Sequence, residues 1–194
     1  MQVSIQDLVK GALSGSLVSF PTDTVPALAT LPHKAELIFA AKQRSQDKPL
    51  ILMGAKAEDL WSYVTGSSEE LQLWQQVAAK YWAGALTLVL PASERVPPEM
   101  NLADPTTIGL RVPNSAIAQH ILSQTGPLAT TSANLSGQPP LQTVAEIESA
   151  FPDVLTLLPT ELAIEESIGV PSTVVKWNGG NWQTLRQGAV KLEF

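Results

Sequence analysis

The sequence predicts an α/β protein built on an open, twisted and mixed β-sheet flanked by helices. Two observations carry this prediction. Short apolar segments of strand length alternate with amphipathic helical segments in the earlier part of the chain, and two strand-like segments near the end flank the turn Asn178-Gly179-Gly180. Alternating strands and helices favour a partly parallel sheet, whereas a hairpin adds antiparallel pairing. The 194 residues fit one domain, placed at residues 1–194, since neither a linker nor an internal repeat interrupts them.

Each element is predicted from its local pattern. Ser4-Ile5-Gln6-Asp7 has the form of a capping box that begins a helix, and Gly15 would end that helix. Further helices are expected at 34–44, 57–64, 68–81, 114–124 with Asn114 as its cap, and from 143 to before 152. Apolar runs predict strands at 17–20, 49–53, 85–90, 107–112, 128–131, 154–158, 172–177 and 182–185.

Composition and charge exclude several classes of protein. The chain has no cysteine, so disulfides, thiolate nucleophiles and cysteine metal sites are absent. It shows neither a signal peptide nor the ~18 consecutive apolar residues of a membrane span, so we expect a cytoplasmic location without a membrane partner. The formal net charge of −6 argues against a stand-alone nucleic-acid binder, because such proteins depend on neutralising phosphates. Only twelve Lys and Arg residues are available, so their positions matter.

Several of these cations lie next to predicted strand ends. Lys42, Arg44 and Lys48 fall within seven residues at a predicted helix end. They either stabilise the helix C-terminus, by ~0.3–1 kcal/mol, or bind an anion. Arg111 ends an apolar strand, where it forms either a half-buried salt bridge or a bidentate contact with a carboxylate or phosphate. Arg186 follows the last strand and is either a solvated edge charge or an anion ligand.

Two hydroxyl-rich loops lie beside predicted strands. The first, residues 129–137, contains Thr130, Ser132 and Asn134, and the second, residues 170–173, contains Ser172. Both are either capped turns or ligand-binding loops, since strand-end loops are the usual ligand site in α/β sheets.

The common catalytic motifs are absent from the sequence. It contains neither GxxxxGK[ST] nor GxGxxG, and His33 and His120 stand outside any zinc or hydrolase pattern. The remaining inventory of hydroxyls and cations suits displacement at phosphorus, in which positioning and charge stabilisation do most of the work.

Taken in order, six motifs resemble the YrdC-like family of threonylcarbamoyl-AMP synthases, and the match runs from about residue 15 to 190. They are Phe20-Pro21-Thr22-Asp23-Thr24-Val25, Lys42-Gln43-Arg44 with Lys48-Pro49-Leu50, Trp82-Ala83-Gly84-Ala85-Leu86-Thr87, Gly109-Leu110-Arg111-Val112-Pro113, Ser132-Ala133-Asn134-Leu135-Ser136-Gly137, and Ser172-Thr173-Val174-Val175 with Leu185-Arg186-Gln187-Gly188.

The resemblance implies a large concave, cationic cavity on the sheet and a nucleotidyltransferase that makes threonylcarbamoyl-AMP and pyrophosphate from L-threonine, bicarbonate and ATP. The residues it implies are Lys42, Arg44, Ser132 and Asn134 for catalysis; Arg44, Lys48, Thr107, Ser132, Pro140 and Arg186 for ATP; and Thr24, Arg111, Thr130 and Ser172 for threonine. Mg²⁺ is expected to arrive with ATP rather than in a dedicated protein site. The product would pass to a tRNA threonylcarbamoyl-transferase complex that modifies the adenosine next to the anticodon.

Three rival interpretations stay open at this point. Pro26 and Met53 depart from the family pattern, which would suit a paralogue with weak or different adenylate chemistry. A second rival is a module that binds tRNA or double-stranded RNA, because the family's cavity is cationic, although the net charge argues against it. The third is the carbamoyl-adenylate domain of hydrogenase maturation proteins, which the absence of cysteine and of flanking domains disfavours.

Overall fold

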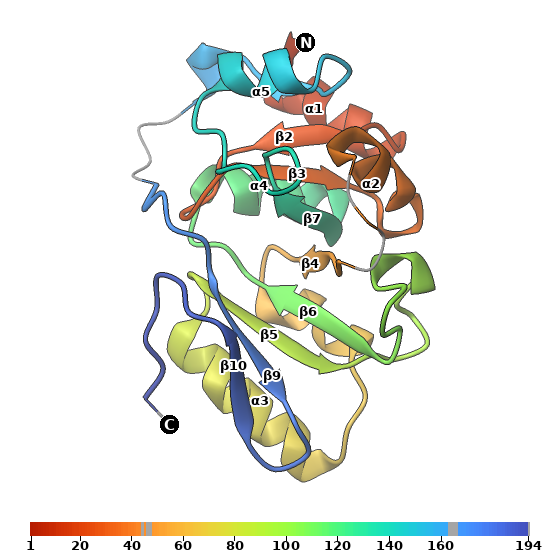
Figure 1. Ribbon diagram of the computed structural model, residues 1–194, viewed down its shortest axis with the longest axis vertical. Helices are drawn as coiled ribbons and strands as arrows, with labels where there is room; N and C mark the ends of the chain where they lie inside the picture. The colour runs from red at the N-terminus through yellow and green to blue at the C-terminus, as the bar shows by residue number, and fades with distance from the viewer. Residues whose placement is uncertain (44, 46–47, 163–166, 194) are drawn as a thin grey trace.

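The computed structural model describes residues 1–43, 45, 48–162 and 167–193 as a mixed sheet with helices packed against it (Figure 1). The main sheet has eight strands in the order β10-β9-β5-β6-β4-β7-β3-β2. Their bounds are β2 Val18–Phe20, β3 Ala27–Thr30, β4 Ile51–Met53, β5 Leu86–Pro91, β6 Thr107–Arg111, β7 Leu128–Ser132, β9 Thr173–Trp177 and β10 Trp182–Arg186. The pairs β4–β6 and β5–β9 are parallel and the other neighbours are antiparallel, so the predicted mixed sheet is confirmed.

Four of the five α-helices of the described residues begin at a polar cap, and the helix that follows Ala35 does not. Their bounds are α1 Ile5–Leu13, α2 Glu36–Lys42, α3 Ser68–Tyr81, α4 Ala116–Thr125 and α5 Val144–Ala150. The hydroxyls of Ser4, Ser67, Ser115 and Thr143 each accept the backbone N–H three residues further on, which satisfies a donor that the first turn leaves free. Ser115 rather than the predicted Asn114 is therefore the cap of α4.

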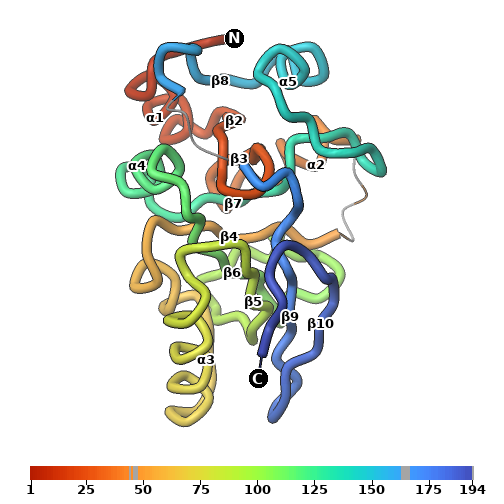
Figure 2. The backbone as a smooth tube through the Cα atoms, turned by 90° about the vertical axis from the view of Figure 1, so that its left-hand side faces the viewer, coloured from red at the N-terminus to blue at the C-terminus, as the bar shows by residue number. Residues whose placement is uncertain are grey.

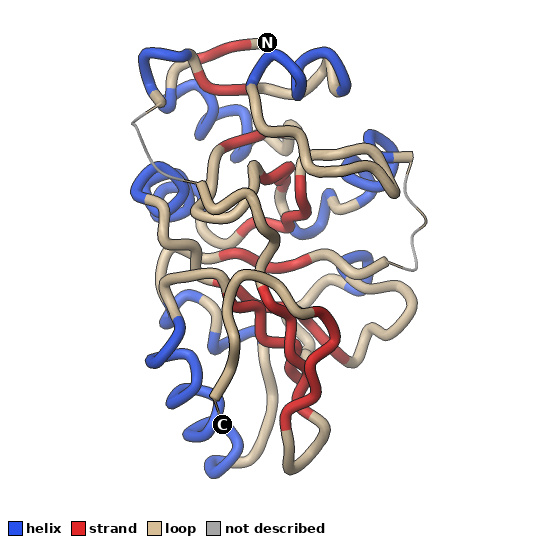
Figure 3. Tube along the Cα trace, turned by 60° about the vertical axis from the view of Figure 1, so that its left-hand side comes forward, coloured by secondary structure: helices blue, strands red, loops and turns tan. Residues whose placement is uncertain are grey.

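Apolar side chains fix the helices on the sheet. On α3, Trp74 and Ala78 are one turn apart, and both are buried against the strand residues Leu86 and Leu88. A second cluster joins α1 and α4 to β2 and β3, and a third packs α5 against Leu28 of β3. Figure 2 shows α1, α3 and α4 along one side of the strands, with α2 and α5 at the upper right. In Figure 3 the strands run through the middle of the molecule with the helices outside them.

Two predicted elements differ in the structure. The helix expected at 57–64 is wrong: two 3-10 turns, Ala57–Asp59 and Trp61–Tyr63, take its place. So short a segment gains little from forming an α-helical nucleus. The strand expected at 154–158 forms only β8 (Thr156–Leu157), which pairs with β1 (Gln2–Val3) outside the main sheet. The sequence pattern also does not predict β3, whose four residues are all buried and therefore show no alternation.

Side chains alternate along the central strands, so the two faces of the sheet carry different sets of residues. Gly109 of β6 lies opposite Val89 and Ile51, Val89 lies opposite Lys176, and Ile51 lies opposite Thr130. Residues paired in this way project from the same face, since successive side chains on a strand alternate. The intervening residues belong instead to the apolar cluster that contains Trp74 of α3, among them Leu52, Leu88 and Leu110.

Candidate active site

A cavity of about 480 Å³ lies on the face of the central strands turned away from α3. Its wall comes from β4, β5, β6, β7, β9 and β10 and from the turn between β2 and β3. Eight of the residues implied by the resemblance line it: Thr24, Lys48, Thr107, Arg111, Thr130, Ser132, Ser172 and Arg186. Segments that are far apart in the sequence therefore converge on one cavity, in the size range of small-molecule sites.

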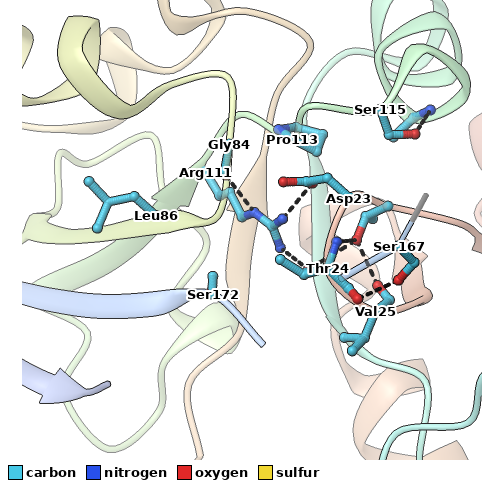
Figure 4. Close-up of polar contacts among 12 residues, drawn as sticks. Asp23, Thr24, Val25, Gly84, Leu86, Arg111, Pro113, Ser115, Ser167 and Ser172 are labelled. Carbon is cyan, nitrogen blue, oxygen red and sulfur yellow. Dashed lines mark hydrogen bonds and ion pairs between the residues drawn. The ribbon is translucent and has the colours of Figure 1, made fainter. Parts of the chain in front are cut away.

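Arg111 is the most constrained polar residue of this cavity. It is 5% exposed, and its Nη2 forms an ion pair with Asp23 Oδ1 at 2.6 Å. Its Nη1 donates to Thr24 Oγ1 at 2.9 Å, and its Nε donates to the carbonyl of Gly84 at 3.2 Å. Figure 4 shows the guanidinium reaching from β6 toward Asp23 and Thr24. Arg111 thus forms a buried salt bridge at the wall of a cavity. Its two interpretations, a structural salt bridge and an anion ligand, both have to account for this pair.

Arg111 also has N–H donors that the three contacts above do not use and from which a ligand could accept hydrogen bonds. A guanidinium carries five N–H donors, and the three bonds above use three of them within the described part of the chain. Burial lowers the pKa of Arg111 from its ordinary value, while the charge of Asp23 opposes that shift and the nearby charge of Arg186 adds to it. Arg111 and Arg186 are therefore close enough to interact, and an anion placed between them would relieve their repulsion.

A short segment beyond the sequence motifs fixes the turn that carries Asp23 and Thr24. The hydroxyl of Ser167 and the N–H of Gly169 donate to the carbonyl of Thr24, and the N–H of Ile168 donates to the carbonyl of Asp23 at 3.0 Å. These bonds hold the Arg111 partners in place from a region about 145 residues away in sequence. No local pattern around Ser167 signals this role.

Arg186 and Ser172 form a second polar cluster on β9 and β10. The guanidinium of Arg186 donates twice to the carbonyl of Ser172, at 3.1 and 2.8 Å. The hydroxyls of Ser172 and Thr87 are hydrogen-bonded at 2.9 Å. Partial burial lowers the pKa of Arg186 from its ordinary value. Arg186 is thus held at the cavity wall rather than left as a free edge charge.

Lys42 lies behind the cavity rather than in its wall. It is 1% exposed, and its Nζ donates to the carbonyl of Ser132 and, at 3.2 Å, to Asn134 Oδ1. The amide of Asn134 in turn donates to the carbonyls of Leu135 and Gln138 at 2.8 and 2.9 Å. This network fixes the shape of the loop after β7, from which Ser132 reaches the cavity. Direct contact of Lys42 or Asn134 with a substrate stays a prediction.

The other implied residues are placed as follows. Lys48 is exposed and lines the cavity next to β4, and Thr107 lines it at the start of β6. The hydroxyl of Thr130 donates to the carbonyl of Ile51 at 3.0 Å. Pro140 is half-buried and does not belong to the cavity wall, and Arg44 lies outside the described residues.

The cavity also contains polar residues that the sequence motifs do not indicate. Asn101 and Asp104, in the loop before β6, line it together with Lys176 of β9. Lys176 Nζ lies 3.5 Å from Asp104 Oδ2. The alternation of Ser172, Val174 and Lys176 along β9 is a signal that could have assigned Lys176 to the same face as Ser172.

Within the described ranges, no group of three or more His, Asp or Glu side chains could hold a metal ion. None of the helices formed by those residues is long and apolar enough to cross a membrane. His33 and His120, as expected, are exposed residues away from the cavity.

Comparisons with known proteins agree with this geometry. The family model for Sua5, YciO and YrdC proteins, described as "Telomere recombination", matches residues 12–188. The threonylcarbamoyl-AMP synthase of Chromohalobacter salexigens is 30% identical over 188 residues, which cover 94% of this chain and 96% of that protein.

Solved structures place the fold in the same group. Sua5 of P. abyssi, complexed with L-threonine, superposes with a TM-score of 0.82 at 31% identity; the match covers 95% of this chain and 54% of that one. The chain thus spans about half of the P. abyssi protein. E. coli YciO superposes with a TM-score of 0.80 at 23% identity over 96% of this chain and 90% of its own, a likeness of fold alone.

Proposed function

The chain belongs to the Sua5, YciO and YrdC family, and we propose that it is a transferase that makes threonylcarbamoyl-AMP and pyrophosphate from L-threonine, bicarbonate and ATP. Two relatives support the proposal: a threonylcarbamoyl-AMP synthase that matches over nearly its whole length, and a Sua5 protein whose structure contains L-threonine. The activity would serve modification of tRNA, and its product would pass to a transferase that acts on tRNA.

One observation carries the proposal. A single cavity joins a buried arginine, surrounded by hydroxyls, to exposed cations at its rim. Arg111, Thr24 and Ser172 suit the carboxylate, amine and hydroxyl of a small amino acid. Lys48 and Arg186 suit phosphate oxygens, since cations near a transferring phosphorus stabilise the charge that develops there. The reaction needs the amino acid and the triphosphate side by side.

The reaction requires little of the protein beyond positioning the substrates. The threonine nitrogen adds to the carbon of bicarbonate, and a carbamate and water result. A carbamate oxygen then attacks the α-phosphorus of ATP, the bond from that phosphorus to the bridging oxygen breaks, and pyrophosphate leaves with the bonding electrons. Holding the two reacting groups in line replaces a collision between solutes with an effectively unimolecular step. The chain would contribute charge and orientation, which agrees with a cavity lined by hydroxyls, cations and the amide of Asn101.

Mg²⁺ fits this arrangement as a companion of the triphosphate, where it would neutralise phosphate charge. Among the described residues, Asp104 is the one carboxylate that lines the cavity, with hydroxyls and one amide around it. Such a donor set is too sparse for an all-protein cage and suits an ion that keeps most of its waters and phosphate ligands.

The test is release of pyrophosphate from ATP with each amino acid in turn, in the presence and absence of bicarbonate. We expect release that requires both threonine and bicarbonate, together with an AMP-containing product. Pyrophosphate release that ignores threonine, or its absence at millimolar substrates, would reject the synthase. Salt-sensitive binding of double-stranded RNA by a protein that releases no pyrophosphate would favour the RNA-binding alternative instead.

A further inference from the structure

The ion pair between Asp104 and Lys176 lies in the wall of the same cavity as the cluster of arginines and hydroxyls just described. Both side chains are partly exposed, at 42% and 32%, so neither is buried as a structural pair would be. Asp104 is held by its surroundings. Its backbone N–H donates to Asn101 Oδ1 at 3.2 Å, and its carboxylate accepts from the hydroxyls of Thr106 and Thr107.

The anchor of this loop is itself buried. Asn101 is 6% exposed, and its amide donates to the carbonyl and the hydroxyl of Thr107 at 3.3 and 3.1 Å. The Asp104 carboxylate is therefore presented by a fixed loop, while Lys176 is presented by β9, which pairs with β10 and β5. Hydrogen bonds from the two threonines lower the pKa of Asp104, which keeps it ionised.

Cations of the cavity fall into two groups. Arg111 and Lys176 each have a carboxylate partner, whereas Lys48 and Arg186 have none within ion-pair distance among the described residues. A triphosphate gains most from the cations whose charge is not already balanced. A balanced pair that offers a donor and an acceptor side by side suits a neutral polar group.

The floor next to this pair is apolar. Val89, Gly109 and Ile51 lie opposite one another in one row across β5, β6 and β4, and Lys176 ends the row on β9. All four residues line the cavity. Gly109 has no side chain, and a Cβ there would come within 3.3 Å of Thr87 Cγ2 and 3.5 Å of Ile51 Cγ1. The methyl group of Thr87 and the side chain of Ile51 therefore border the middle of the row, and Gly109 itself projects no side chain there.

We infer that Asp104 and Lys176 read the hydrogen-bonding edge of the nucleobase, while its ring lies on the Val89–Gly109–Ile51 floor. Adenine presents an amino donor beside a ring-nitrogen acceptor, which is complementary to a carboxylate beside an ammonium. This inference rests on the proposed function, because it takes the ligand to be a nucleotide. It adds a base-specificity role to two residues outside the motifs.

The experiment is calorimetric binding of ATP and ITP, without threonine, to the full chain and two variants. ITP replaces the amino group by an oxo group and the ring acceptor by a donor, so the pair should reject it. We expect the wild type to bind ATP roughly tenfold more tightly than ITP, the factor that about 1.4 kcal/mol corresponds to. The two variants are Lys176→Met, which keeps the apolar stem of the side chain, and Asp104→Asn. Each should raise the Kd for ATP and reduce the preference for ATP over ITP.

A matched control is Lys10→Met, which breaks the exposed Lys10–Asp7 ion pair of α1, 3.2 Å long, away from the cavity. It should change neither Kd. The inference is overturned if the wild type binds ATP and ITP equally, or if Lys176→Met leaves the Kd for ATP within twofold. Because binding is measured without turnover, a wild type that binds ATP selectively but releases no pyrophosphate with threonine would sink the synthase and keep the inference.

Discussion

Replacement of Arg111 separates its structural role from its proposed role in binding threonine. Arg111→Ala would leave the carboxylate of Asp23, 8% exposed, without its ion partner. Removing one partner of a buried pair costs about 3–5 kcal/mol of unfolding free energy. At roughly 2–4 °C per kcal/mol for a chain of this size, the melting temperature should fall by about 6–20 °C. Arg111→Ala alone therefore cannot distinguish the two roles.

Arg111→Lys is the sharper variant. It keeps a positive charge opposite Asp23. One ammonium cannot replace both of the guanidinium's hydrogen bonds to Thr24 and Gly84, so the unfolding free energy should fall by about 1–3 kcal/mol. The variant also loses the planar fork that fits a carboxylate bidentately. We expect a folded protein with a raised threonine requirement and little change in its affinity for ATP.

The assay is urea unfolding at increasing threonine, in the presence of nucleotide, beside threonine titrations of activity. A ligand that binds only the native state stabilises it by RT ln(1 + [L]/Kd), about 2.7 kcal/mol at a hundred times Kd. The wild type should show this increment, and Arg111→Lys should show it only at higher threonine. If both proteins gain the same increment at the same threonine concentration, Arg111 does not bind threonine. Asp23→Asn is the control, because it should lower the unfolding free energy by breaking the same ion pair while Arg111 is kept.

Three further predictions test the surroundings of the cavity. Lys42→Met should lower the unfolding free energy by about 1–3 kcal/mol, because it removes the hydrogen bonds that the buried ammonium donates to the carbonyl of Ser132 and to Asn134 Oδ1, and thermal melts measure it. Gly188→Ala should raise the KM for ATP and lower the melting temperature, because its Cβ would lie 2.2 Å from the carbonyl oxygen of Pro171 and displace the segment that carries Arg186; an unchanged KM would contradict this. Arg44→Ala, which rests on the resemblance, should keep its melting temperature and lose ~10²–10³ in turnover.

The sequence predicted the elements whose signals are local. The helix expected at 68–81 coincides with α3, and the closing hairpin follows from its glycine turn. The strand β3 was missed because both of its faces are buried, so no alternation marks it. Boundaries and short turns such as Ala57–Asp59 depend on packing that the sequence does not display.

The candidate site shows the same division between local and tertiary information. Ordered motifs identify about half of the cavity-lining residues, because each motif lies at the beginning or the end of a strand. They do not reveal that the ammonium of Lys42 points into the loop at Ser132, ninety residues further along the chain. Nor do they pair Asp104 with Lys176, because only the folded sheet brings the loop before β6 against β9.

The distribution of charge explains how a chain with a net charge of −6 could hold a triphosphate. Asp23 and Asp104 balance Arg111 and Lys176, which leaves the excess positive charge of the described cavity at Lys48 and Arg186. Arg186 is fixed by two hydrogen bonds to one carbonyl, so its charge is presented without reorganisation when an anion arrives. Binding would then depend on where a few unbalanced cations lie rather than on the sign of the whole surface, and moderate salt should weaken ATP binding less than it weakens binding to an extended basic surface.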